Sequence, residues 1–175
     1  RQDGPVPVYL AHAMGGGAES FLQDCIARNV ARGGSVVILR VGQGYRWKIE
    51  LHVSSGMTQG VSNDFTLIEK LIALLPKRRI IYSCGVNERD ALKLPDRLLR
   101  LAGHGGKRPQ PIEILIHDFF PVSPSYTLLG QDGFYHGVPV ADGLLAGDPV
   151  HVYERPGGVI ASLAEWQGAW GGLIS

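Results

Sequence analysis

The strongest constraint on the fold of this chain is an alternation of short apolar runs with stretches of helical periodicity. Residues 6–13 are apolar on both faces and lead directly into three glycines, which is typical of a buried parallel strand entering a tight turn. From Ala18 onward, apolar residues recur at helical spacing until Gly33 and Gly34. The opening segment is therefore predicted to be a strand, a glycine turn and a helix.

Further strands are predicted where apolar runs recur along the chain, at residues 35–41, 45–53, 80–84 and 112–116. Residues 45–53 alternate apolar and polar side chains after a glycine turn at 42–44, as a half-exposed hairpin partner does. The runs at residues 35–41 and 80–84 are expected to be buried.

Helices are predicted between and after these strands, at residues 66–75, 87–102 and 163–173. Thr66 and Glu69 resemble a capping box for the first, and the second is expected to restart at Pro95. Residues 54–63, 103–111 and 119–139 are expected to be loops, the last with a small hairpin.

Because strand and helix alternate, the predicted fold class is α/β: a Rossmann-like, mostly parallel sheet with helices on both faces. A length of 175 residues fits a single domain over residues 1–175. Cys25 and Cys84 are expected to be small buried residues, and a disulfide between them is the less favoured alternative.

The composition bears on partners and location. With 17 basic and 16 acidic side chains the net charge is +1, so nucleic acid is not predicted as a partner. We find no apolar stretch long enough to span a bilayer and no signal peptide, and a cytoplasmic location is expected. The basic run at residues 77–79 is interpreted as a solvated loop, and the alternative is peripheral contact with acidic lipids at the inner membrane face.

Ligands of doubly wound sheets bind beyond the carboxyl ends of the strands. Three predicted strand exits, at residues 12–19, 83–87 and 117–126, should therefore lie at one edge of the sheet. The candidate substrate-binding residues at the first exit are His12, Gly15, Gly16, Gly17 and Glu19.

The three glycines of the first exit would let a ligand approach the backbone, and the following helix start would offer N–H groups to a phosphate or sugar oxygen. Alternatively, these glycines only form a tight turn and Glu19 only favours the helix start. At the second exit, Gly85 is a weaker candidate for substrate binding and is equally explained as a turn glycine.

The third exit carries His117 and Asp118, the candidate catalytic pair, followed by the aromatic Phe119 as a candidate substrate contact. A lone histidine after a strand is more often structural, but aromatic side chains beside a few polar groups favour a ligand surface. We find no hydrolase elbow, no P-loop, no Asp-x-Asp pair and no zinc spacing, so no metal site is predicted.

Four segments together resemble the amino-terminal domain of family 4 glycosyltransferases with the GT-B fold, in the branch that makes bacterial cell-surface polysaccharides. They are YLAHAMGGGAESFLQDCIA, LPDRLLRLAG, IHDFFPVSPSYTLLGQDGFYHGVP and LAEWQGAWGGLIS. The resemblance covers nearly the whole chain. Relatives often carry cysteines where Ser123 and His136 stand here.

The resemblance implies a retaining transferase without a bound metal or cofactor, which moves a sugar from a nucleotide-sugar to a glycan or lipid-linked acceptor. In this family the amino-terminal domain mostly binds the acceptor, and a carboxy-terminal domain, expected as a partner, mostly binds the donor. The glycine turn would lie beside the donor diphosphate and His117 beside the transferred sugar. Two alternatives remain: a non-catalytic carbohydrate- or nucleotide-binding module, and an oxidoreductase in which Arg40 receives a cofactor 2′-phosphate.

Overall fold

The computed structural model describes residues 4–42, 46–106, 108–140 and 148–174. The described chain divides into two compact units, one of residues 1–88 and 97–117, the other of residues 89–96 and 118–175. The prediction of a single domain over residues 1–175 remains a prediction.

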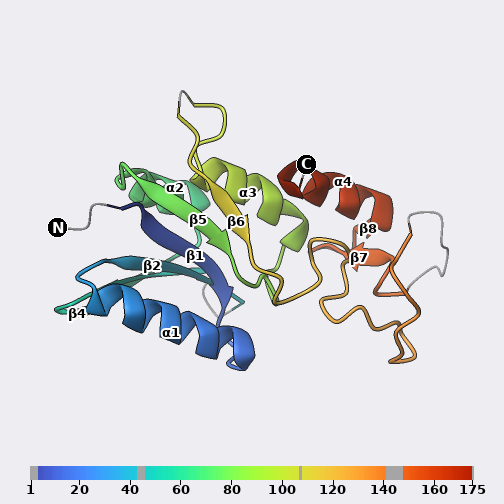
Figure 1. Ribbon diagram of the computed structural model, residues 1–175. Helices are drawn as coiled ribbons and strands as arrows, with labels where there is room; N and C mark the ends of the chain where they lie inside the picture. Colours follow the sequence, from blue (N-terminus) through green and yellow to red (C-terminus); the bar gives the residue numbers. More distant parts are fainter. Residues whose placement is uncertain (1–3, 43–45, 107, 141–147, 175) are drawn as a thin grey trace. The chain divides into compact units, whose positions relative to one another are not determined.

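The first unit contains a six-stranded sheet with the order β4-β3-β2-β1-β5-β6 (Figure 1). Its strands are β1 (Val6–His12), β2 (Val36–Val41), β3 (Trp47–Val53), β4 (Gly56–Ser62), β5 (Arg78–Tyr82) and β6 (Ile112–Ile114). β2, β1, β5 and β6 run parallel to one another, and β3 and β4 are antiparallel additions next to β2. The predicted α/β class with a mostly parallel sheet is confirmed.

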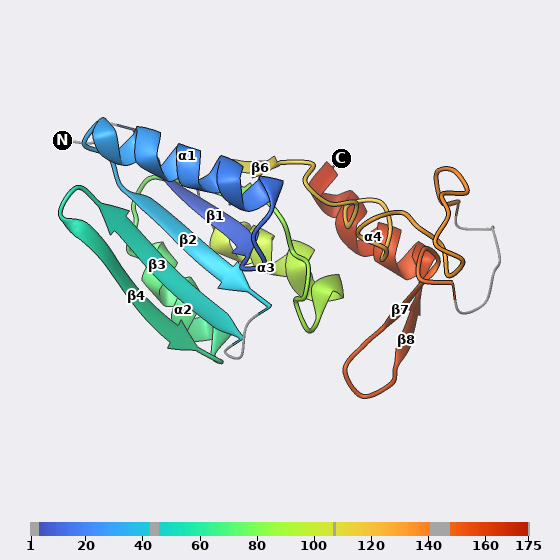
Figure 2. The same ribbon diagram turned by 90° about the horizontal axis from the view of Figure 1, so that it is seen from below.

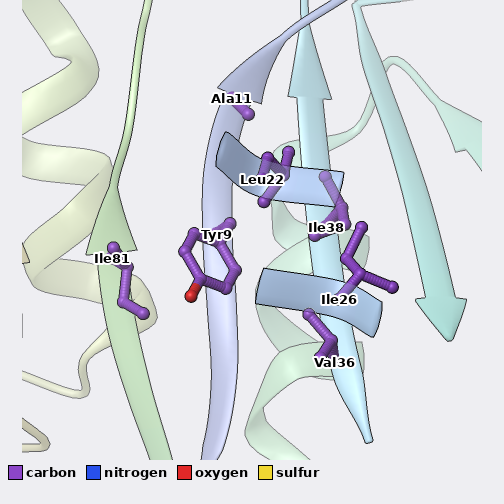
Figure 3. Packing of buried hydrophobic residues seen from close by; sticks show 7 residues of the cluster. All are labelled: Tyr9, Ala11, Leu22, Ile26, Val36, Ile38 and Ile81. Carbon is purple, nitrogen blue, oxygen red and sulfur yellow. The ribbon is translucent and has the colours of Figure 1, made fainter. Parts of the chain in front are cut away.

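Helices cover both faces of this sheet, as predicted (Figure 2). On one face, helix α1 (Gly17–Ala31) inserts Leu22 and Ile26 between side chains of β1, β2 and β5 (Figure 3). These strand side chains are Tyr9, Ala11, Val36, Ile38 and Ile81. Every second residue of each strand contributes, because side chains alternate between the faces of a sheet.

The opposite face is covered by helix α2 (Phe65–Ala73), which buries Ile68 and Ile72. Residues 97–101 of helix α3 (Leu94–Leu101) lie on this face too, since the Arg97 guanidinium is 5.0 Å from the centre of the Trp47 ring and 5.6 Å from that of Phe65. Both faces of β1 and β2 are consequently buried, which explains why these strands are apolar except for His12 and Arg40 near their ends.

The second unit is built around aromatic side chains. It contains the short helix η1 (Ala91–Lys93), the hairpin of β7 (Val152–Glu154) and β8 (Ile160–Ser162), and helix α4 (Leu163–Ile174). Trp166 and Trp170, one turn apart on α4, are both fully buried and stacked with a centroid separation of 6.2 Å. Phe120 and Tyr153 pack against Trp166 at 5.3 and 5.0 Å.

Several predicted boundaries are wrong. Residues 56–62 form β4 instead of a polar loop, because the strand is stabilised by pairing along the whole of β3 and not by a buried face of its own. Helix α2 is capped by the Asp64 carboxylate, which accepts a hydrogen bond from the Thr66 N–H at 2.8 Å, whereas Glu69 forms an ion pair with Arg100. The predicted capping box is therefore absent.

The helix predicted at residues 87–102 is also shorter than expected. Asn87 has a φ of 68°, which a right-handed helix excludes, and the regular helix begins only at Leu94. The strand predicted at 112–116 ends at Ile114, and the hairpin of β7 and β8 was not predicted. The predicted turn at 42–44 lies largely outside the described residues, apart from Gly42 with a φ of 79°. Cys84 is buried as predicted, Cys25 is only half-buried, and the two do not form a disulfide.

Candidate functional site

The exits of β1, β5 and β6 lie at one edge of the sheet, as the parallel topology requires. Leu10 is paired with Tyr82, which is paired in turn with Ile114. Beyond β5 the backbone stays close to β1, since the Ser83 N–H donates to the Leu10 carbonyl at 2.9 Å. The predicted convergence on one edge is confirmed for the ends of these strands, whereas residues 118–126 of the third exit belong to the second unit.

The glycine turn after β1 is open and depends on glycine for its backbone conformation. Gly15 and Gly16 have φ angles of 82° and 85°, in the region that disfavours residues with a Cβ atom. A Cβ atom at Gly15, Gly16 or Gly17 would meet no atom within 4 Å, so the space beside the turn is empty. The requirement for glycine here is thus conformational, and it leaves the backbone accessible.

His12 organises this turn rather than projecting from it. Its ring is buried, and its Nδ1 accepts a hydrogen bond from the Met14 N–H at 2.8 Å. A ring nitrogen that accepts in this way carries no proton, so a neutral His12 has its proton on Nε2. We assign His12 to the support of the turn.

Helix α1 begins at this turn without a side-chain cap. Gly16 is the N-cap residue and has no side chain to accept a hydrogen bond from the first turn. The N–H groups at the start of a helix carry partial positive charge and bind anionic oxygens. The amino end of α1 is therefore suited to a phosphate or a sugar oxygen.

Glu19, in the first turn of α1, forms hydrogen bonds within the protein. Arg40 donates to both of its carboxylate oxygens, at 2.6 and 2.9 Å, and Gln23 donates to one of them at 2.7 Å. The bonds to Arg40 hold the pKa of Glu19 below its usual value of 4.5. These bonds assign Glu19 to the anchoring of α1 on the sheet and not to the ligand.

Arg40 itself is buried between two carboxylates. Besides Glu19, its guanidinium donates to Glu50 at 3.0 Å and to the His12 carbonyl at 3.0 Å. Burial opposes its charge, but the two glutamates outweigh this effect and raise the pKa of Arg40. A guanidinium committed in this way is poorly placed to receive a cofactor 2′-phosphate, which weakens the oxidoreductase alternative.

His117 is exposed and has contacts with two other elements of the first unit. Its Nδ1 shares a hydrogen bond of 3.0 Å with the Ser83 hydroxyl, which lies just past β5. Its ring meets the ring of Phe21, in the second turn of α1, edge to face at a centroid distance of 5.2 Å. Among the described residues Nε2 has no hydrogen-bond partner, so this nitrogen is available to a ligand.

Ser83 and Phe21 were not predicted as site residues. Ser83 follows a strand directly, which is a signal for a strand-exit position, but its pairing with a residue 34 positions away is invisible in the sequence. Phe21 is one of the apolar residues that recur at helical spacing after Ala18, yet it is exposed and packs on His117. The two residues fix the ring of His117 close to the start of α1.

The other predicted site residues have local structural roles. Gly85 is buried, and its N–H donates to the Tyr82 hydroxyl at 3.0 Å. Asp118 and Phe119 belong to the second unit. The Asp118 side chain is 4% exposed and accepts a hydrogen bond from the Phe120 N–H at 3.1 Å, while Phe119 is exposed.

No group of three or more His, Cys, Asp or Glu side chains suited to a metal ion occurs in the described ranges. None of the helices within those ranges combines the length and the apolar character needed to cross a bilayer. The basic run at residues 77–79 is partly engaged, since Arg78 donates to the Leu75 and Leu101 carbonyls and Arg79 pairs with Glu113.

Comparison with known proteins returns no match: no protein-family model, no curated protein and no solved structure is significantly similar to this chain.

Proposed function

We propose that this chain is the acceptor-side domain of a retaining, metal-independent glycosyltransferase. Such an enzyme moves a sugar from a nucleotide-sugar donor to a glycan or lipid-linked acceptor in the cytoplasm, at the inner face of the membrane. One observation carries the proposal: an exposed histidine, fixed by Ser83 and Phe21, stands beside an uncapped helix start at the carboxyl edge of a parallel sheet. The sequence resemblance to the GT-B family 4 enzymes supports it independently.

The chemistry follows from these groups. A sugar leaving a nucleotide-sugar transfers negative charge to the departing diphosphate, and fixed N–H donors stabilise developing charge best when they are already oriented. The open backbone of Gly15–Gly17 and the first turn of α1 supply such donors. In the proposed mechanism His117 donates a hydrogen bond from Nε2 to the transferred sugar, while Ser83 holds the ring through Nδ1. Asp118 shapes the loop that follows.

A carboxy-terminal domain would complete the cleft and bind most of the nucleotide. Residues 1–175 alone are therefore expected to show little or no turnover. The full-length protein is expected to transfer sugar from one member of a nucleotide-sugar panel, with activity retained in a metal chelator.

The test compares three variants of the full-length protein with the most active donor. His117→Ala should lower kcat about 100-fold, the size expected for loss of one charge-stabilising hydrogen bond in an active site. Ser83→Ala should lower kcat about tenfold, since the ring stays but loses its fixed orientation. His104→Ala is the matched control, an exposed histidine in a loop, and should leave kcat unchanged.

The outcomes separate the proposal from its alternatives. An unchanged kcat in His117→Ala removes this residue from the mechanism. If a nucleotide-sugar binds and is never turned over by the full-length protein, the chain is a carbohydrate- or nucleotide-binding module. Robust turnover by residues 1–175 alone would contradict the proposal that this chain forms only one side of the active-site cleft.

A further inference from the structure

The sheet of the first unit has an unprotected edge at β4. The opposite edge strand, β6, has only three residues, whereas β4 has seven, of which six are exposed. Its sequence, GMTQGVS, contains no charged residue and no proline. Edge strands are normally blunted by charges, prolines, bulges or brevity, because their free N–H and C=O groups otherwise pair with another strand. β4 has none of these protections.

An apolar helix surface lies beside this edge. Phe65 and Glu69 of α2 face α3, where both contact Arg100. Helical geometry then directs Leu67, Leu71 and Leu74 to the other side of α2, away from α3. Leu74, the residue that ends the helix, is 76% exposed, and Leu67 and Leu71 are also exposed.

Strand and helix together form one surface. Leu71 and Leu74 line an open groove of about 360 Å³ whose other wall includes Thr58 and Gly60 of β4. The leucine stripe therefore faces the same edge of the sheet as β4, and Figure 2 shows β4 as the outermost strand with α2 behind the sheet. A partner that pairs with β4 would cover the stripe at the same time.

β4 is complementary to itself. In an antiparallel pair with Gln59 opposite its own copy, Met57 lies opposite Val61 of the other copy, on the face that carries α1. Both residues are 49% exposed, so two apolar cross-strand pairs would form around one central amide pair. The two-fold axis would stand perpendicular to the sheet, which brings α2 of each copy to the same face.

We propose that β4 and the Leu67–Leu71–Leu74 stripe form a homodimer interface in which two copies join their sheets edge to edge. A dimer of this kind buries the same surface on both copies, as two-fold assemblies do. Because this surface is formed by β3, β4 and α2, the proposal is independent of the function assigned to the strand-exit edge.

The first test is sedimentation equilibrium of the chain and of Gln59→Lys. The unaltered chain should sediment at twice the monomer mass. Gln59→Lys sets two ammonium groups opposite each other and should weaken association roughly tenfold or more. Gln23→Lys, the same charge change on α1, is the matched control and should remain dimeric. A monomer at the highest soluble concentration, or equal weakening in both variants, overturns the proposal.

The second test determines the register of the β4–β4 pair. Its decisive result is the restoration of the dimer in a double variant, which unfolding of the chain cannot produce. Met57→Lys and Val61→Glu should each weaken the dimer, and the double variant should restore it, because the new lysine of one copy would face the new glutamate of the other. Amide hydrogen exchange should show the N–H groups of β4 that point away from β3 protected in the dimer and unprotected in Gln59→Lys, while those that bond to β3 stay protected in both. The proposal that a second copy pairs with β4 is contradicted if the double variant associates more weakly than either single variant. It is also contradicted if β4 is protected only when another protein is added.

Discussion

The two compact units of this chain differ in how their buried polar groups are satisfied. In the first unit the backbone groups of six strands bond to one another along continuous ladders. In the second, residues 118–151 contain no regular strand within the described ranges, and side chains supply many of the bonds. The buried Ser123 hydroxyl donates to the Val150 carbonyl and accepts from the Ser125 N–H, and Asp148 accepts from the N–H groups of Gln131 and Val150.

This difference indicates which substitutions should destabilise each unit. A ladder spreads its stability over many equivalent backbone bonds, so the loss of one polar side chain is tolerated. A loop with a buried interior depends on particular side chains, because an unpaired buried N–H or C=O group costs about as much as a lost hydrogen bond. Single substitutions should therefore have larger local effects in the second unit.

The largest effect is expected at Trp166. Its fully buried ring contacts Phe120, Tyr153 and Trp170, and its Nε1 donates to the Phe120 carbonyl at 2.6 Å. Trp166→Ala should cost about 3–5 kcal/mol and speed amide hydrogen exchange first in α4 and around Phe120.

The matched variant in the first unit is Trp47→Ala, which removes an equally buried ring. It should speed exchange first in β3 and its neighbours. If either tryptophan variant loosens both units to the same extent, the two units do not open separately and the comparison fails.

An intermediate effect is expected from a pair of buried serines, one in each unit. Ser123→Ala leaves the Ser125 N–H and the Val150 carbonyl without their partner and should lower the free energy of unfolding by about 1–3 kcal/mol. Ser83→Ala should cost about 0.5 kcal/mol, because within the described residues the hydroxyl bonds only to the exposed ring of His117, and the backbone ladder is unchanged. Denaturant titration measures both values, and a cost for Ser83→Ala equal to that for Ser123→Ala would contradict the distinction.

The smallest effect concerns pH and tests the buried charge network around Arg40 in the first unit. Arg40 holds the pKa of Glu19 below its usual value of 4.5, and the pKa of Glu50 is lowered too, because Lys48, His52 and Arg40 outweigh the opposing effect of burial. Carboxylates with lowered pKa values stabilise the fold above their usual pKa, and this stability is lost as pH falls through the lower, folded value.

The midpoint of the unfolding transition should accordingly change little with pH near neutrality. It should decrease as the pH is lowered below about 4.5. Glu19→Gln should flatten part of that acid slope while leaving the second unit unchanged. An acid slope identical in the variant and the unaltered chain would show that the network does not contribute.

The sequence predicts much of the first unit because a strand that is buried on both faces appears in the sequence as a run of apolar residues. β1 and β2 are apolar except near their ends, and Leu22 and Ile26 recur at helical spacing, so the predicted bounds of β1, α1 and β2 lie within a few residues of the observed ones. β4 gave no such signal, since its polar residues form a strand only through pairing with β3. The hairpin of β7 and β8 has strands of three residues with a single buried side chain, Ala161, so it too lacks an apolar pattern in the sequence.

The candidate site shows the same division. That Gly15–Gly17 and His117 share one edge follows from strand direction alone, a topological rule that needs no side-chain contact. The roles of single residues did not follow. The Glu19 carboxylate accepts hydrogen bonds from Arg40, and the Asp118 carboxylate accepts one from the Phe120 N–H. The linear sequence does not reveal either of these pairings.

The sequence by itself determined the class of fold, the edge of the sheet where the strand exits meet, and the need for glycine at Gly15 and Gly16. Periodicity and backbone conformation are local properties, so they can be read from neighbouring residues. Only the tertiary structure decided which groups face a ligand. Hydrogen bonds such as that between Ser83 and His117, or between Arg40 and Glu19, join residues distant along the chain, and their geometry exists only once the sheet has formed.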